Sequence, residues 1–349
     1  MTQRIIYTSN TSSALDELLV EAAPDRIFLL TDDNTHRLCK PLTAECKALC
    51  AASEFVIGAG DTHKTLDTLA DVWKCLCEKD ASRKSLLVNL GGGMVTDLGG
   101  FAAATFKRGI PFVNVPTTLL SMVDAAVGGK TGINFHGLKN EIGCFCESRA
   151  VVIDTRFLCT LDRQNLLSGY AEMLKHALLE SRDMWAGHLL FDTDAPDYAL
   201  LQRLVEQSVQ TKQRIVTADP CEQGIRKALN LGHTTGHAFE SFAMERNCPV
   251  LHGYAVAWGL ICELYLSAVC LGFPTLEMRR TVDFIQRNYG SFAFTCHDYE
   301  HLYALMRHDK KNAGGVINFT LLGGIGDIRI NQNPDKQTVF DAFDFLREG

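Results

Sequence analysis

Short apolar runs alternate with amphipathic stretches through the first half of the chain, and this alternation constrains the fold more than any other feature. Five of the runs have the length and content of buried strands, and they begin at Arg26, Glu54, Ser85, Pro111 and Ala150. Stretches with helical periodicity lie between them, for example over residues 65–77 and 95–105. Strands separated by helices of this length are typical of βαβ units and a mainly parallel sheet. The first half is therefore predicted to be an α/β domain.

The pattern changes near residue 162. Beyond it come long stretches with a period of about 3.6 residues, over residues 161–179, 198–216, 225–245, 255–271 and 275–287. Residues 315–331 predict a β-hairpin, and a last helix is expected from about residue 335. A length of 349 residues also favours two domains. We expect an α/β domain over residues 1–163 and a mostly α-helical domain over residues 164–349.

Composition excludes several classes of function. The formal net charge is -7, whereas proteins that bind nucleic acid or anionic membranes broadly are basic. The thirteen cysteines include no CxxC pair, which favours reduced thiols. The N-terminal residues show no apolar segment of signal-peptide length, and the longest uncharged stretches are too short or too interrupted to span a membrane. We expect a cytoplasmic protein without a nucleic-acid or membrane partner.

Two glycine-rich segments could bind phosphate. LGGGMVTDLGG, from Leu90, follows a predicted strand and opens a predicted helix, where free N–H groups and the helix dipole favour an anion. It lacks the GxGxxG spacing, and a tight turn without a ligand is the alternative. VGGKTGIN, from Val127, places Lys130 in a flexible backbone with Arg108 and Lys139 on either side. The alternative there is a solvated basic loop.

Histidines in the second half predict a metal site. His233 and His237 lie four apart on a predicted helix, so they share a face, and His252 could supply a third imidazole. Glu172 could add a carboxylate oxygen, with Lys175 beside it. A Glu, His, His set with an open position is typical of catalytic zinc. A structural role for the histidine pair is the alternative, and the spacing alone does not choose between these groups and His176.

Further cations have no assignment from local pattern. Lys212, Arg226, Lys310 and Lys311 would ordinarily belong to solvated helix faces. In an acidic chain, however, an anionic ligand requires a local basic cluster. These residues are candidates for it.

Seven segments in a fixed order carry a family resemblance over about residues 30–325. They read GGGMVTDLGGFAAATFKRG, PTTLLSMVDAAVGGKTGIN, GLKNEIG, GYAEMLKH, GIRKALNLGHTTGHAFE, LHGYAVAWG and HDKKN. The chain resembles the 3-dehydroquinate synthase family of sugar phosphate cyclases, in its short bacterial form. The resemblance implies a Rossmann-like NAD-binding domain, a helical domain that binds metal and substrate, zinc or cobalt as the metal, and a homodimer.

The resemblance also implies roles for individual residues. The metal ligands would be Glu172, His233 and His252. The catalytic group would be Lys130, Lys175, Glu222, Arg226, Asn230 and His237, with His237 moving a proton and Glu222 accepting one. The substrate would contact Arg108, Asp124, Lys130, Lys139, Lys175, Lys212, Arg226, Asn230, His237, Lys310 and Lys311, with Arg108 reaching the phosphate from the partner subunit. NAD would contact Asp32, Asn34, Asp61, Lys64, Gly92, Gly93, Asp97, Thr117, Thr118, Lys139, Phe157 and Thr160.

Two positions depart from the family pattern. Asp61 stands where the family often has Glu, which shortens the reach to a ribose hydroxyl but keeps an acceptor. Tyr254 stands where many members have Glu, two residues after the predicted ligand His252. Because groups around the ligands orient them, this second change is expected to affect metal affinity more than the type of reaction.

The implied activity belongs to the shikimate pathway of aromatic amino acid biosynthesis. It is the conversion of 3-deoxy-D-arabino-heptulosonate 7-phosphate to 3-dehydroquinate and phosphate, a carbon–oxygen lyase reaction. NAD oxidises the substrate transiently, phosphate is eliminated, the hydride returns, and an intramolecular aldol step closes the ring.

Three alternatives stay open. One is another cyclase acting on sedoheptulose 7-phosphate or glucose 6-phosphate, since substrate choice depends on a few pocket residues. Another is a metal-dependent polyol dehydrogenase, which would accumulate NADH. The third is a catalytically silent metal-binding or interaction protein, which would bind zinc and NAD without turnover.

Overall fold

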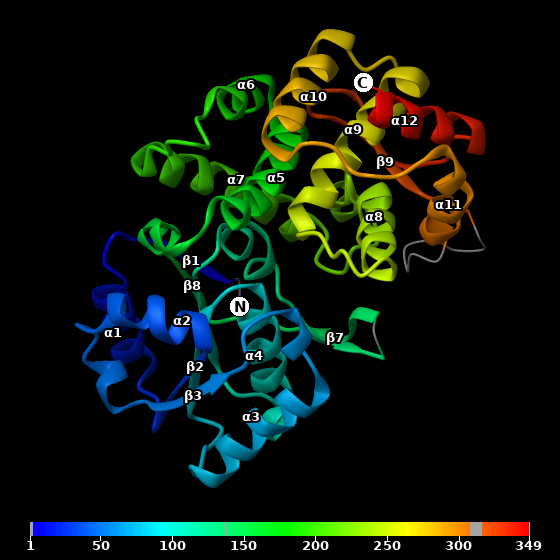
Figure 1. Ribbon diagram of the computed structural model, residues 1–349. Helices are drawn as coiled ribbons and strands as arrows, with labels where there is room; N and C mark the ends of the chain where they lie inside the picture. Colours follow the sequence, from blue (N-terminus) through cyan, green and yellow to red (C-terminus); the bar gives the residue numbers. More distant parts are fainter. Residues whose placement is uncertain (1–2, 137, 308–315, 349) are drawn as a thin grey trace. The chain divides into compact units, whose positions relative to one another are not determined.

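Two compact units make up the chain in the computed structural model, which describes residues 3–136, 138–307 and 316–348. Unit 1 comprises Met1–Asp162 and Tyr198–Val209, and unit 2 comprises Arg163–Asp197 and Gln210–Gly349. Lys310 and Lys311 lie outside the described residues. Figure 1 shows the elements of each unit.

Unit 1 is built on a six-stranded parallel sheet with the order β1-β8-β5-β4-β2-β3. The strands are β1 (Arg4–Tyr7), β2 (Ile27–Asp32), β3 (Ser53–Ile57), β4 (Leu86–Gly91), β5 (Phe112–Pro116) and β8 (Ala150–Ile153). The five apolar runs predicted as strands are all present. The edge strand β1 was not predicted, because its four residues are too few to show a period.

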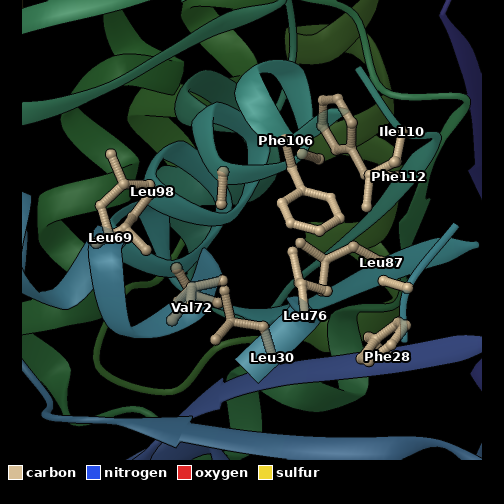
Figure 2. Close-up of a cluster of buried hydrophobic side chains, with 14 of the residues drawn as sticks. Phe28, Leu30, Leu69, Val72, Leu76, Leu87, Leu98, Phe106, Ile110 and Phe112 are labelled. Atoms are coloured by element: carbon tan, nitrogen blue, oxygen red, sulfur yellow. The ribbon is translucent and has the colours of Figure 1, made fainter. Parts of the chain in front are cut away.

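Four helices pack against this sheet, and they are α1 (Thr11–Ala22), α2 (Asp33–Leu38), α3 (Leu66–Glu78) and α4 (Gly93–Thr105). Unit 1 also contains the 3-10 helices η1 (Lys40–Thr43), η2 (Ala48–Ala51), η3 (Asp61–His63), η4 (Phe106–Arg108) and η6 (Thr155–Thr160). Helix α3 turns Leu69, Val72 and Leu76 into the core, a spacing that keeps them on one helix face. Figure 2 shows Leu69 near Leu98 of α4, Val72 near Leu30 of β2 and Leu76 near Leu87 of β4, all in one core cluster. Each such side chain contributes about 1.5–3 kcal/mol on burial.

The order of the strands reverses between β2 and β4. The chain passes from β2 to β3 on one side, then crosses to β4 and β5 on the other. Leu30 of β2 pairs with Asn89 of β4, and Gly91 of β4 pairs with Pro116 of β5. The carboxyl ends of these strands are therefore neighbours at the reversal, where open α/β sheets bind their ligands.

The second glycine-rich segment forms a hairpin and not a flexible loop. It follows the one-turn π-helix η5 (Ser121–Ala125), and its antiparallel strands are β6 (Lys130–Phe135) and β7 (Leu138–Phe145). A Cβ atom on Gly143 would lie 2.1 Å from the carbonyl oxygen of Thr131. Glycine thus allows the two backbones to approach closely.

Unit 2 is mostly helical. Its helices are α5 (Arg163–Glu180), α6 (Arg182–Leu190), α8 (His233–Glu245), α9 (His252–Leu271), α10 (Thr275–Tyr289), α11 (Tyr299–Arg307) and α12 (Lys336–Glu348), with 3-10 helices η7 (Ile225–Asn230) and η8 (Cys296–Asp298). Helix α7 (Tyr198–Ala218) contributes its residues from Gln210 onward. The predicted hairpin is present as β9 (Phe319–Gly324) and β10 (Asp327–Gln332). The predicted fold class is confirmed.

One helix prediction was wrong. Residues 225–245 do not form a single helix, because the chain turns at Gly232, whose φ is 79°. A Cβ atom there would lie 2.9 Å from the side chain of Leu260 and 3.0 Å from the carbonyl oxygen of Val256. Only glycine fits both the conformation and the space. The break makes His233 the first residue of α8.

Two glycines on α9 bring its backbone close to other helices of unit 2. A Cβ atom on Gly253 would lie 1.9 Å from the carbonyl oxygen of Ser168 on α5, and one on Gly259 would lie 2.0 Å from that of Gly232 before α8. These contacts set the separation of the three helices that carry the predicted metal ligands.

Helix α9 is long and apolar enough to cross a membrane by length and composition. Within the most apolar stretch of this helix, 67% is buried inside the protein. It packs against α5, α8, α10 and α12, so its apolar surface serves as the core of unit 2.

Candidate metal, cofactor and substrate sites

Three side chains from three helices of unit 2 converge on one point. Glu172 comes from α5, His233 begins α8 and His252 begins α9. The Nε2 atoms of His233 and His252 lie 3.3 and 3.4 Å from the same atom, Oε1 of Glu172. That oxygen is buried and accepts no hydrogen bond of normal geometry. Two imidazoles and one carboxylate facing a point form the donor set of a catalytic zinc site.

Glu172 is ionised by its surroundings. It forms an ion pair with Lys175, three residues later on α5, and their side chains are 0% and 1% exposed. Burial alone would raise the pKa of the Glu172 carboxyl, but attraction to Lys175 and then to His233 holds that pKa well below its ordinary value. The carboxylate can therefore bind a cation at neutral pH without first losing a proton.

A second carboxylate contacts His252. Oε2 of Glu240, on α8, lies 3.1 Å from Nδ1 of His252. Burial disfavours the charged imidazolium, but attraction to Glu240 and the contact with Glu172 raise the pKa of His252 to about 10. The two carboxylates favour positive charge at this point, and a divalent ion would supply that charge. The residues present therefore fit a metal ion.

A carboxylate from α9 holds the start of α8. Glu263, which is fully buried, accepts hydrogen bonds from the backbone N–H groups of Gly232 at 2.6 Å and Thr235 at 3.1 Å. No side chain at the N-cap position does this, so Glu263 satisfies the helix end. Nδ1 of His233 lies 3.1 Å from the carbonyl oxygen of Leu231. These contacts orient the ring of His233 so that its Nε2 faces Glu172.

His237 lies one turn after His233 and is half-buried. Its ring centroid is 5.3 Å from that of His233 and 6.1 Å from that of His252. It is thus beside the three ligands predicted for the metal, and it could move a proton there. His176, which the spacing did not separate from the ligands, is fully buried on α5.

Two cations predicted to contact substrate are buried in unit 2. Lys212 on α7 is 6% exposed and Arg226 on η7 is 2% exposed, unlike residues of solvated helix faces. Nη1 of Arg226 donates a hydrogen bond to the carbonyl oxygen of Pro220 at 2.6 Å. Buried cations are rare unless they are paired or bind a ligand.

Glu222 and Asn230 contact each other near the same turn. Nδ2 of Asn230 donates to Oε1 of Glu222 at 3.1 Å, and Glu222 has a φ of 59°. Asp219 holds the turn, because its Oδ2 accepts from the N–H groups of Gly224 and Arg226 at 2.7 and 3.1 Å. The predicted pair is therefore brought together.

Half of the residues predicted to bind NAD lie at or just after the carboxyl ends of neighbouring strands in unit 1. They are Asp32, the last residue of β2, with Asn34 after it, Gly92 and Gly93 after β4, and Thr117 and Thr118 after β5. Helix α4 begins at Gly93, directly after β4 at the reversal of the sheet, and no side chain at its N-cap position satisfies its first N–H groups. Such a helix start suits the pyrophosphate of a dinucleotide.

Lys64, Asp97 and Asp61 form a polar group beside this edge. Nζ of Lys64 lies 2.6 Å from Oδ2 of Asp97 and also donates to Asn140 of β7, and the Lys64 side chain is 4% exposed. Asn134 of β6 donates from Nδ2 to Oδ2 of Asp61 at 3.0 Å. The hairpin β6–β7 is therefore tied to the residues that follow β3.

Phe157 and Thr160 lie in η6, after β8. Phe157 is 1% exposed, and Oγ1 of Thr160 donates to its carbonyl oxygen at 2.7 Å. Phe157 is therefore an interior residue of unit 1 and not a surface residue.

The substrate-binding residues predicted in unit 1 lie in three places. Asp124 is in η5, and Lys130 and Lys139 are exposed on the hairpin β6–β7. Arg108 lies in a turn where its φ is 69° and that of Lys107 is 49°. Beside it is an open hollow of about 580 Å³, lined by Ser82, Arg83, Thr105, Lys107 and Arg108. Three cations make this hollow suitable for an anion.

The sequence reading missed Glu240 and Glu263. Glu240 lies seven residues after His233 and three after His237, which places all three on one helix face. Glu263 is the one Asp, Glu, Lys or Arg in the apolar segment His252–Leu271. A lone carboxylate in such a helix signals a buried partner.

Family models match nearly three-quarters of the chain. The model described as 3-dehydroquinate synthase N-terminal matches residues 54–168, and the C-terminal model matches residues 169–312. The chain belongs to the 3-dehydroquinate synthase family. The family predicted from the seven segments is confirmed.

Curated relatives agree with this assignment. The 3-dehydroquinate synthase of Parabacteroides distasonis is 53% identical over 346 residues, which cover 99% of this chain and 98% of the relative. That of Leptospira interrogans is 38% identical over 331 residues, covering 93% and 90%. The predicted activity, 3-dehydroquinate synthase, is thereby supported along the whole chain.

Solved structures share the fold. The 2-epi-5-epi-valiolone synthase of Streptomyces hygroscopicus, with NAD+ and Zn2+ bound, superposes with a TM-score of 0.85 at 25% identity over 100% of this chain and 97% of that one. A 2-deoxy-scyllo-inosose synthase gives 0.84 at 21% over 99% and 96%. The maleylacetate reductase of Agrobacterium tumefaciens gives 0.69 at 15% over 99% and 96%. The likeness to the latter two structures shows the fold alone.

Proposed function

We propose that the chain converts 3-deoxy-D-arabino-heptulosonate 7-phosphate to 3-dehydroquinate and phosphate, as a carbon–oxygen lyase that uses NAD and a divalent metal ion. The convergence of Glu172, His233 and His252 on one point carries the proposal. Together with family membership it supports the metal-dependent chemistry of a cyclase. The reaction belongs in the cytoplasm, consistent with thirteen free cysteines and the absence of any disulfide among them.

The metal would be zinc or cobalt, held by Glu172, His233 and His252. When bound, it would supply a Lewis acid for the substrate hydroxyls. Lys175 holds Glu172 ionised, and His237 lies where it could take or return a proton. A relative by fold, at 25% identity, binds NAD+ and Zn2+ together, which agrees with this pairing of cofactors.

NAD would bind unit 1 at the carboxyl ends of β2, β4 and β5. When bound, it would accept a hydride from the substrate and return it later in the cycle. The start of α4 would receive the pyrophosphate, and Lys64 and Asp97 would contact the dinucleotide beside it. The buried side chain of Phe157 would form part of the wall of this NAD site.

The substrate carries a carboxylate and a phosphate, so it needs cations. Lys175, Lys212 and Arg226 are buried, where a charge acts more strongly on a ligand than in water. They would hold and orient the sugar acid, while Asn230 and Glu222 would contact its hydroxyls or accept a proton.

The phosphate would be bound by exposed cations. Lys130 and Lys139 of the hairpin would contact it, with Lys310 and Lys311 as further candidates from sequence. Arg108 would come from the partner subunit of a homodimer, and its open, cation-lined hollow is consistent with a role at a surface shared with another molecule. Asp124 would contact the sugar.

The decisive experiment supplies the metal-loaded protein with the heptulosonate phosphate and with NAD+ far below the substrate concentration. We expect many turnovers per NAD+, with phosphate and 3-dehydroquinate formed in equal amounts and no accumulation of NADH. NADH that builds up with substrate would contradict the proposal in favour of a dehydrogenase. Turnover only with sedoheptulose 7-phosphate or glucose 6-phosphate would contradict the substrate. Stoichiometric metal and NAD binding with no turnover at all would contradict the enzymatic function.

A further inference from the structure

Glu240 is a buried carboxylate that the reaction outlined above does not use. It lies on α8, is 6% exposed as a residue, and places Oε2 at 3.1 Å from Nδ1 of His252. The other nitrogen of that ring, Nε2, lies 3.4 Å from Oε1 of Glu172. His252 is therefore held between two carboxylates, one on each ring nitrogen.

The two histidines of the site have different partners at Nδ1. In His233 this nitrogen faces the carbonyl oxygen of Leu231 at 3.1 Å, whereas in His252 it faces Glu240. Both partners are acceptors, so in a ring whose Nε2 binds a metal ion Nδ1 keeps its proton and donates it to that partner. Only the Glu240 contact adds a full negative charge.

Tyr254 does not occupy this place, although it stands where the family pattern has a carboxylate. Its ring packs against Tyr289 and Trp258, with centroids 5.1 and 5.9 Å away. The carboxylate that contacts His252 comes from a different helix, seven residues after His233. The departure at 254 thus leaves the contact at Nδ1 of His252 intact.

We propose that Glu240 is a positioning residue of the metal site, which fixes the orientation and tautomer of His252 and strengthens its Nε2 as a ligand. The inference rests on the proposed function, because it requires the Glu172, His233 and His252 site to hold a metal. A carboxylate behind a metal-bound imidazole makes the ring more basic and prevents its rotation. Glu240 therefore acts on the metal through His252 without contacting it.

Metal affinity tests this role directly. The parent protein, Glu240→Gln and Glu240→Ala are freed of metal and titrated with zinc in competition with a chromophoric chelator. We expect a zinc affinity about tenfold weaker for Glu240→Gln, which keeps an acceptor without its charge, and about 100-fold weaker for Glu240→Ala. The visible absorption of the cobalt-loaded proteins should change in the same order, because the ligand field at cobalt follows the ring.

Glu277→Gln is the matched control. Glu277 is also a largely buried glutamate of unit 2, 7% exposed, but its partner is Arg182 on α6. We expect its zinc affinity to stay within about twofold of the parent value, even where its melting temperature falls. If Glu240→Ala does not fold, the near-isosteric Glu240→Gln decides alone.

Three results would count against the inference, and they distinguish a failure of the positioning role of Glu240 from a failure of the proposed metal function. Parent affinity in both Glu240 variants would refute the positioning role while leaving the metal site in place. A tenfold loss in Glu277→Gln as well would refute it too, since any buried carboxylate would then matter equally. A parent protein that binds no stoichiometric zinc would overturn the proposed metal function, and the inference with it.

Discussion

Gly253 offers a way to disturb the metal site without touching a ligand. It lies on α9, next to His252, and faces the carbonyl oxygen of Ser168 on α5, the helix that carries Glu172. In Gly253→Ala the new Cβ would lie 1.9 Å from that oxygen, whereas ordinary contact begins at 3.4 Å. The obstacle is backbone on a packed helix, so a side-chain rotation cannot relieve it.

The consequence can be worked out from those distances. The helices α5 and α9 must separate by about 1.5 Å, the difference between the contact imposed and the ordinary one. Metal ligands must lie within about 0.2 Å of their ideal distances. We therefore expect zinc affinity to fall by at least about 100-fold and the free energy of unfolding to fall by about 1–3 kcal/mol, the usual cost of overpacking.

Gly187→Ala is the control for that variant. Gly187 lies within α6 of unit 2, and a Cβ there would meet nothing within 4 Å. Its substitution should stabilise the protein by about 0.5–1 kcal/mol, because alanine favours a helix more than glycine does. Zinc titration against a chelator and urea unfolding of both variants check the pair. Parent zinc affinity in Gly253→Ala would refute the argument that this close contact sets the ligand geometry.

Three further predictions concern buried charges and a buried histidine. Glu172→Gln should abolish zinc binding and lower the stability of the metal-free protein by about 3–5 kcal/mol, since it leaves Lys175 buried without its partner; unfolding curves that match the parent would contradict this. Lys64→Met should weaken NAD binding at least about tenfold in calorimetry, because Asp97 loses its cation, while Lys74→Met on the solvated face of α3 should not. Burial lowers the pKa of His188 to about 4, from 6.5 in an unfolded chain. Because the unfolded state binds the proton first, the free energy of unfolding should fall by up to about 3 kcal/mol as pH falls from about 6.5 to 4. His188→Gln should flatten that slope in unfolding measured across the window, and an unchanged slope would show that another group causes it.

Several parts of the fold could be predicted because their cause is local. A buried parallel strand needs an unbroken apolar run, and the runs that begin at Arg26 and Ser85 show it without any partner. The spacing of Leu69, Val72 and Leu76 by itself predicts a helix. The strand β1 was missed because its four residues are too few to show a period, and the hairpin β6–β7 was missed because β7 is exposed along nearly all of its length and so has no buried apolar alternation.

The candidate site, like the fold, has features that the sequence predicts and features that it does not. The sequence by itself determined that imidazoles, a carboxylate and cations are available, and the order of its segments determined the family. Local spacing did not determine which histidines face Glu172, since His176, His233 and His237 all satisfied a helical spacing. Only the tertiary structure decided this, because the break at Gly232 places His233 at a helix start, held by Glu263.

Residues 172 and 252 meet for a reason that no local pattern contains. The backbones of α5 and α9 touch at Ser168 and Gly253, and that contact fixes how far apart their side chains begin. Glu240 then approaches His252 from a third helix. A metal site of this kind depends on distances of tenths of an ångström between separate helices, and such distances follow from packing alone.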